Sequence, residues 1–98
     1  MKQVNKQTYE NERLILAYFV DDDRRGYESP SVIGVSVTGD EYKRSSWASP
    51  KLLKMVARGL FRRNDKGLYQ LTPKGRAYYK REFLGLVSAL PDDEIENL

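Results

Sequence analysis

Hydrophobic positions near the start of the chain recur with the period of an α-helix, about 3.6 residues. The residues that carry this pattern are Leu14, Ile15, Tyr18 and Phe19. Thr8 is suited to cap this helix. The acidic Glu10 and Glu12 interact favourably with the positive end of the helix dipole at its N-terminus. The pattern predicts a first helix over 8–21, followed by a loop that includes Arg24 to Gly26.

The next segment, SVIGVSVTG, has an ambiguous pattern. Three valines, one isoleucine and an interior glycine favour a strand. The preceding Ser29 and Pro30 instead favour a helix, because they combine an N-cap with a proline at the first helical position. We predict a short second helix, since it fits between its neighbours, and a turn over Gly39 to Arg44.

A third helix is predicted to follow this turn and to end at Gly59. Its candidate caps are Ser45, Ser46 and Ser49. With either of the first two, the helix spans 45–58. With the last, Pro50 takes the first helical position and the helix shrinks to 50–58.

Two sets of side chains separate on this third helix at about 100° per residue. The set expected in the core is Ala48, Leu52, Met55 and Val56. The set expected on the surface is Trp47, Lys51, Lys54 and Arg58. An outward aromatic side chain with three cations suits the major groove of DNA, although Trp47 could instead pack under the preceding turn.

The pattern then changes to two short strands around a turn. LFRRNDKGLYQL predicts a hairpin over 60–71 with its loop at 64–67, where Gly67 supplies a positive φ. Thr72 and Pro73 repeat the cap-and-proline signal and open a C-terminal helix over 73–90. The last residues, 91–98, are expected to form a tail.

Composition extends this interpretation. The 98 residues suffice for a single domain over 1–98, of the α+β class and mainly helical. The net charge of +3 conceals an asymmetry: five basic and eight acidic residues over 1–42, twelve and one over 43–81, and none and five over 82–98. The middle segment therefore has a net charge of +11, which favours a polyanionic partner.

The same composition argues against several classes of protein. The chain has no cysteine and no histidine, which removes thiol nucleophiles, imidazole bases and the usual zinc ligands. No apolar run approaches the roughly 20 residues of a membrane span, and the start lacks the apolar stretch of a secretory signal. We expect a cytoplasmic protein that is not an enzyme and takes no metal, cofactor or small-molecule ligand.

The run KLLKMVARGLFRRNDKGLYQLTPKGRAYY resembles the winged helix-turn-helix regulators, including the multiple-antibiotic-resistance and PadR-like groups. In those families an apolar recognition helix ends in a GL step, enters a short wing and returns through a strand that ends in LTPKGR or a near variant. The resemblance covers roughly residues 12–80. It implies a three-helix core with a two-stranded wing and a C-terminal helix. The recognition helix would be 45–58 and the wing 60–71. The connection GDEYKR and the valine-rich second helix depart from the family pattern.

These observations predict sequence-specific binding of double-stranded DNA by a small transcription regulator, a repressor. The predicted DNA contacts are Lys43, Arg44, Ser45, Ser46, Trp47, Ser49, Lys51, Lys54, Arg58, Arg62, Arg63 and Lys66. Ser46, Trp47, Ser49 and Lys51 are the candidates for base edges, whereas the hairpin cations would contact phosphates or the minor groove.

We also expect a homodimer that reads two half-sites. Its candidate contacts on the C-terminal helix are Phe83, Leu84, Leu86, Val87 and Leu90. The alternative for these side chains is packing against the first helix. The alternative for the whole protein is a winged-helix module that binds an acidic protein, or that serves a replication or partition assembly. RNA binding is a further option.

Overall fold

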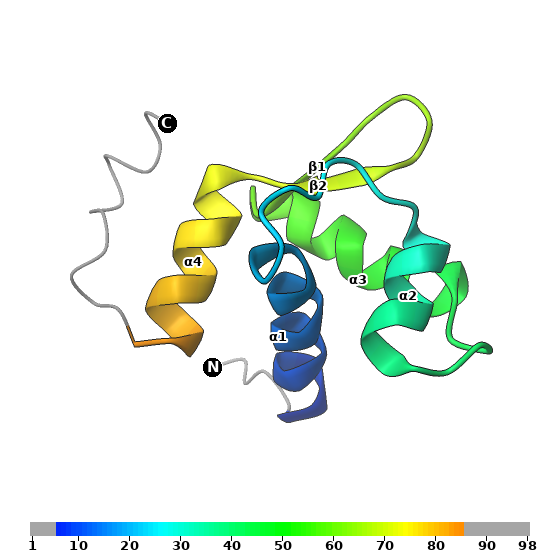
Figure 1. Ribbon diagram of the computed structural model, residues 1–98, viewed down its shortest axis with the longest axis horizontal. Coiled ribbons are helices and arrows are strands. Elements are labelled where there is room, and N and C mark those ends of the chain that lie inside the picture. Colours follow the sequence, from blue (N-terminus) through cyan, green and yellow to red (C-terminus); the bar gives the residue numbers. More distant parts are fainter. Residues whose placement is uncertain (1–5, 86–98) are drawn as a thin grey trace.

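The computed structural model describes residues 6–85, in which the chain forms four helices and one two-stranded antiparallel sheet (Figure 1). The elements are α1 (Lys6–Val20), α2 (Pro30–Thr38), α3 (Ser45–Ala57), β1 (Phe61–Arg63), β2 (Tyr69–Leu71) and α4 (Pro73–Phe83). The α+β, mainly helical class expected from the sequence is therefore confirmed. Within the same residues, no helix combines the length and apolar character needed to cross a bilayer.

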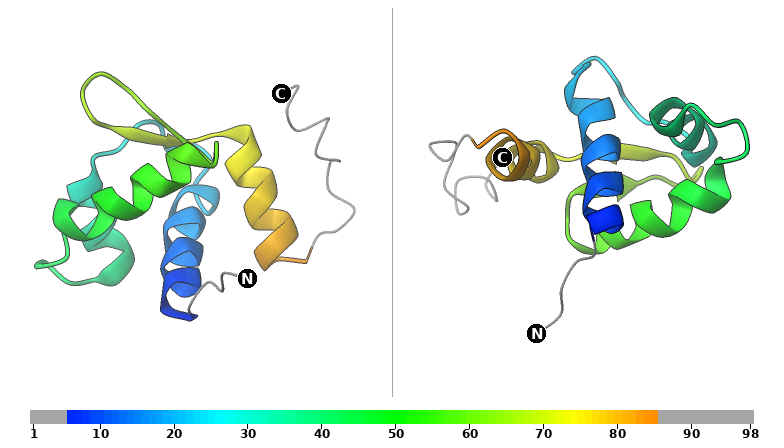
Figure 2. Two further views of the ribbon diagram at one scale, coloured as in Figure 1. Left: turned by 180° about the vertical axis from the view of Figure 1, so that it is seen from behind. Right: turned by 90° about the horizontal axis from the view of Figure 1, so that it is seen from below.

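The core lies where α1, α2, α3 and the base of the hairpin meet. Its buried side chains are Ile15, Leu16, Phe19, Ile33, Ala48, Leu52, Met55, Leu60, Phe61, Tyr69, Leu71 and Tyr79. In α1, the predicted positions Ile15 and Phe19 are buried together with Leu16, while Leu14 is only half-buried. Figure 2 shows α1 between α4 on one side and the pair α2 and α3 on the other.

The ambiguous second segment is a helix, as predicted. The Ser29 hydroxyl accepts a hydrogen bond from the Val32 N–H at 3.2 Å, and Pro30 stands at the start of α2. The interior glycine, Gly34, had counted in favour of a strand. In the helix it instead makes room for a neighbouring segment. A Cβ atom at Gly34 would lie 2.4 Å from the carbonyl oxygen of Lys43, so glycine is what lets the turn before α3 cross α2 closely.

None of the three serines caps α3. The helix starts at Ser45, and its N-cap, Arg44, makes no side-chain capping bond. Pro50 lies inside the helix, as in the longer alternative over 45–58, so the shorter helix over 50–58 is wrong. The Arg44 carbonyl instead opens the helix by accepting from the N–H groups of Trp47 and Ala48, each at 3.0 Å. Pro50 removes one later helical bond, at a position where its ring is exposed.

The hairpin forms as predicted, with Phe61 opposite Leu71 and Arg63 opposite Tyr69. Gly67 has a φ of 76°, a left-handed conformation that glycine adopts without strain. A third segment joins the sheet through Glu28, whose backbone exchanges two 2.8 Å hydrogen bonds with Tyr69. The hairpin is thereby tied to the segment that leads into α2.

The C-terminal helix begins as predicted and ends earlier. The Thr72 hydroxyl accepts from the Gly75 N–H at 3.0 Å, and it donates to the Gly59 carbonyl at 2.7 Å. The helix stops at Phe83, where Leu84 is its C-cap, instead of continuing to residue 90. Gly85 then takes a φ of 68°, which breaks the helical backbone. Residues 86–98, including the predicted tail, lie outside the described residues.

Candidate nucleic-acid interface

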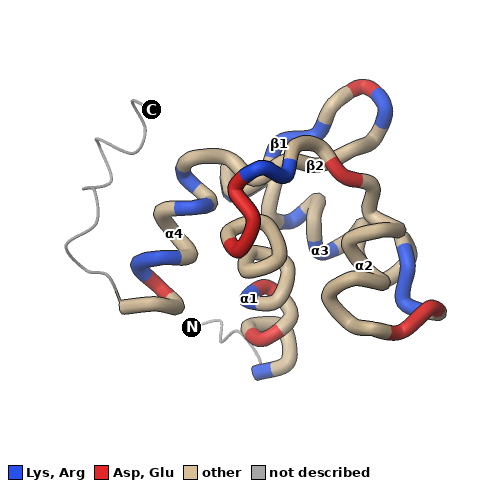
Figure 3. The backbone as a smooth tube through the Cα atoms, viewed as in Figure 1, with Lys and Arg blue, Asp and Glu red and all other residues tan. Residues whose placement is uncertain are grey.

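Three segments with predicted DNA contacts lie on one side of the molecule. Viewed from behind in Figure 2, α3 is in front, the hairpin projects above it, and the turn between α2 and α3 lies beside its N-terminus. Figure 3 shows basic residues along the hairpin and in this turn, where acidic residues are also present. The predicted contacts on these segments fall into groups with different surroundings.

The hairpin carries the most accessible group, formed by Arg62, Arg63 and Lys66. All three side chains are exposed, including both residues that follow the buried Phe61 in β1. The Arg63 guanidinium lies 5.8 Å from the centre of the Tyr69 ring. None of the three forms an ion pair with an acid of residues 6–85. These cations are exposed, and their contact with a polyanion stays a prediction.

The loop of the hairpin is held by Asn64. Its side-chain oxygen accepts hydrogen bonds from the N–H groups of Lys66 and Leu68, each at 3.0 Å. Its backbone N–H donates to the Leu68 carbonyl, and its carbonyl accepts from the Gly67 N–H, also at 3.0 Å. Four bonds at one residue fix the loop in a single shape, so the hairpin cations are presented from an ordered scaffold.

Lys51 does not project outward, contrary to the prediction. Its ammonium group donates to the Trp47 carbonyl at 3.0 Å and lies 4.3 Å from the centre of the Trp47 ring. Burial, followed by the nearby charges of Lys43 and Lys54, lowers its pKa. A hollow beside it is lined by Thr8, Glu12, Pro50, Lys51 and Lys54. Trp47 itself is half-buried against the core, which fits the packing alternative better than an outward role.

Arg58 is exposed, as predicted, but its guanidinium also contacts other parts of the protein. Its guanidinium donates to the Glu12 carboxylate of α1 at 2.6 Å. The same group lies 5.2 Å from the centre of the Tyr78 ring of α4. Arg58 therefore links the end of α3 to two other helices.

The outermost face of α3 differs from the predicted one. Its exposed residues after the first turn are Pro50, Leu53, Lys54 and Ala57, and Ser46 precedes them on the same side. The predicted stripe lies beside the core, because Lys51 is three positions from Ala48 and four from Met55. Of the predicted cationic stripe, Lys54 and Arg58 are exposed and Lys51 is half-buried. The missed residue is Leu53, which is 51% exposed, and a helical plot of positions opposite the core would have found it.

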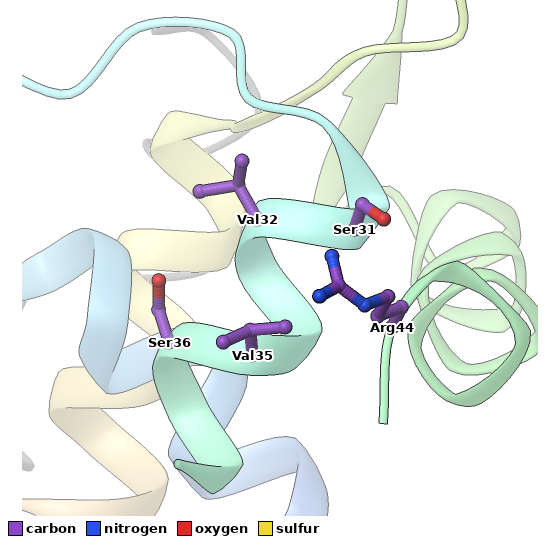
Figure 4. Close-up of a pocket in the computed structure, with 5 residues that line it drawn as sticks. All are labelled: Ser31, Val32, Val35, Ser36 and Arg44. Atoms are coloured by element: carbon purple, nitrogen blue, oxygen red, sulfur yellow. The ribbon is translucent and has the colours of Figure 1, made fainter. Parts of the chain in front are cut away.

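The turn before α3 holds Lys43 and Arg44, both exposed as expected. The Arg44 Nε atom donates to the Glu41 carbonyl at 2.6 Å. Figure 4 shows the Arg44 side chain directed from the start of α3 toward α2, over a shallow hollow. This hollow is lined by Ser31, Val32, Val35, Ser36 and Arg44. Tyr42, which the sequence analysis overlooked, is 92% exposed next to Lys43.

The remaining predicted serine contacts are placed differently from one another. Ser45 and Ser46 are exposed at the start of α3, while Ser49 is half-buried. Ser46 can therefore be reached by a partner on the outer face of α3. Ser49 is less accessible, because it lies at the edge where α3 meets the rest of the protein.

The predicted dimer contacts are also divided. Phe83 packs inside the chain, with its ring centre 4.8 Å from Tyr9 of α1 and 5.5 Å from Tyr79. Leu84 is 53% exposed. Leu86, Val87 and Leu90 lie outside the described residues. For Phe83, packing against the first helix is the observed arrangement, whereas Leu84 stays available to a partner.

Residues 6–85 contain no group of three or more acidic side chains arranged to hold a metal ion. Comparisons with protein-family models, with curated proteins and with solved structures find no match for this chain. A functional proposal therefore depends on the geometry of the described residues.

Proposed function

We propose that this chain is a winged helix-turn-helix module that binds double-stranded DNA and acts as a small transcription regulator. In this interpretation α2 and α3 form the helix-turn-helix, and the hairpin of β1 and β2 is the wing. Gly34 supports the assignment, since its missing Cβ lets the turn pass over α2. The backbone bridge between Glu28 and Tyr69 supports it too, because it fixes the wing relative to the start of α2.

The observation that carries the proposal is the set of hairpin cations, Arg62, Arg63 and Lys66. They are exposed, lack ion-pair partners among the described acids, and stand on a loop that Asn64 orders. Cations held in this way can neutralise backbone phosphates at a low entropic cost, because their support is already ordered.

In the proposed complex α3 enters the major groove, which is wide enough to admit a helix. The wing lies on the adjacent phosphates or over the minor groove, and Lys43 and Lys54 add backbone contacts. A module bound at an operator would regulate transcription by excluding or recruiting polymerase. Sequence specificity would be increased by a homodimer that spans two half-sites about 34 Å apart.

Binding to a fluorescent random-sequence duplex, followed by anisotropy over about 50–200 mM salt, tests the proposal. If about five phosphates are neutralised, the logarithm of affinity falls against the logarithm of salt with a slope of roughly −4 to −5. A triple variant of the wing, Arg62→Gln, Arg63→Gln and Lys66→Gln, should bind more weakly. Its slope should be smaller in magnitude by about 2 to 3.

A matched control removes the same charge elsewhere. Lys6→Gln, Arg24→Gln and Lys80→Gln lie on α1, on the loop after it and on α4. This triple variant should keep the wild-type slope, whereas equal losses in both triples would mean that only net charge matters. Affinity that does not respond to salt, or no retention of DNA at low salt, would contradict DNA binding and favour the module that binds an acidic protein.

A further inference from the structure

The outer face of α3 has a composition that phosphate binding does not explain. Ser46, Pro50, Leu53 and Ala57 follow one another at spacings of four, three and four residues, which places them on one side of the helix. This side is opposite the buried Ala48, Leu52 and Met55. Its only large side chain is Leu53, which is 51% exposed. The face that would be deepest in a groove therefore presents one aliphatic side chain among small ones.

Leucine has no hydrogen-bonding group, so it can distinguish base pairs only by contact with an apolar group. In the major groove that group is the 5-methyl of thymine. Ser46 and Ala57 are small, which lets the helix approach the base edges closely along this face. We propose that Leu53 is a specificity-determining residue that contacts a thymine methyl group, an inference that rests on the proposed binding of duplex DNA by α3.

Charge favours DNA over a protein as the occupant of this face. Lys54 is exposed next to Leu53, and the wing, which carries three exposed cations, lies beside the same helix (Figure 2). A docking surface for a protein usually has several large apolar or aromatic anchors around its centre. On the outer face of α3, Leu53 lies among a proline, an alanine and a serine. This apolar surface is too small for a protein interface, but it is large enough to contact one methyl group.

The test begins with selection of bound sequences from a random duplex pool by the wild-type protein. In the selected duplex, each thymine is then replaced singly by uracil, which removes the methyl group and keeps the base pair. At one thymine in each half-site, replacement should weaken wild-type binding about fourfold, the effect expected for one buried methyl group. Leu53→Ala should bind the thymine and uracil duplexes equally at that position.

Val32→Ala is the matched control, because Val32 is an aliphatic side chain of α2 that is 50% exposed. It should keep the fourfold preference for thymine. Circular dichroism and thermal unfolding should show that both variants fold, as is expected of substitutions at exposed positions.

Two negative results have different meanings. In the first, wild-type protein binds DNA with a strong salt dependence, but each replacement of thymine by uracil changes its affinity and that of Leu53→Ala equally. Leu53 then does not contact a thymine methyl group, and the proposed function stands. If no sequence is selected and no salt-dependent binding occurs, the proposed function and this inference both fail.

Discussion

Arg58 at the end of α3 donates a 2.6 Å hydrogen bond to Glu12 of α1, a residue 46 positions earlier in the chain. The Glu12 side chain is only 14% exposed, so the pair is partly shielded from solvent. Arg58, which the sequence pattern predicted to contact DNA, therefore links α3 to α1. Its replacement should affect folding before it affects binding.

We expect Arg58→Met to lower the free energy of unfolding by about 1 kcal/mol, through loss of the ion pair and of the contact with the Tyr78 ring. Urea denaturation measures this change. Lys54→Met is the control, because Lys54 is exposed on the same helix and has no ion-pair partner among the described acids. It should alter stability by less than about 0.5 kcal/mol while weakening DNA binding. The reverse pattern would show that Arg58, and not Lys54, faces the DNA.

Gly34→Ala should destabilise the protein although alanine is the better helix former. The added Cβ would lie 2.4 Å from the Lys43 carbonyl oxygen and 2.7 Å from that of Arg44, both of which are backbone atoms. We expect a loss of about 2 kcal/mol, because the cost of overpacking exceeds the gain of up to about 1 kcal/mol in helix propensity. Gly26→Ala, where nothing lies within 4 Å, should be nearly neutral in the same denaturation experiment. Equal stability of the two variants would mean that the turn does not cross α2 closely.

Thr72→Val should cost about 1–2 kcal/mol of unfolding free energy, since it removes the cap of α4 and the bond to the Gly59 carbonyl. Valine keeps the shape of threonine, so the loss isolates the hydroxyl. Thr72→Ser retains both hydrogen bonds and should stay close to wild type in thermal unfolding. A neutral Thr72→Val variant would show that neither bond contributes to stability.

Lys51 should make stability depend on pH in the alkaline range. Its pKa is lowered from 10.5 in the folded protein, mainly by burial, so the unfolded chain binds this proton more tightly. At a pH below the folded pKa, the charged form of Lys51 lowers the free energy of unfolding. This destabilisation is lost as the pH rises through the folded pKa toward 10.5. Relative to Lys51→Met, the wild-type protein should become more stable over that range.

Urea denaturation of both proteins at a series of pH values up to 10.5 measures this difference, and the titration of the tyrosines cancels in the comparison. A difference that stays constant with pH, or that falls as the pH rises, would mean that Lys51 is as freely hydrated as an outward lysine.

Several elements could be predicted because their signals are local. Ser29 and Pro30 start α2, Thr72 and Pro73 start α4, and Gly67 closes the hairpin loop. Each of these signals acts between residues within about four positions of one another, where backbone geometry leaves few alternatives. The same reasoning left two starts open for α3 and named three serines as caps, whereas the helix begins at Ser45, has Arg44 as its N-cap and contains Pro50.

The candidate site was harder to predict, because it depends on which side of α3 the other helices cover. A stripe of spaced cations looked like an outer face, yet Lys51 folds back on Trp47 and Arg58 pairs with Glu12. Leu53, which the helical pattern assigned to neither set, is 51% exposed. Residue type and spacing define the stripes of a helix but leave open how the helix is turned toward its neighbours.

Caps, turns and the +11 charge of residues 43–81 follow from neighbouring residues and from composition, so the chain alone contains them. The outward face of α3, the ion pair between Arg58 and Glu12 and the close crossing at Gly34 arise only when distant segments meet. They depend on how α1, α2 and the hairpin share one core, and packing of that kind is a property of the whole chain that no short stretch of sequence specifies.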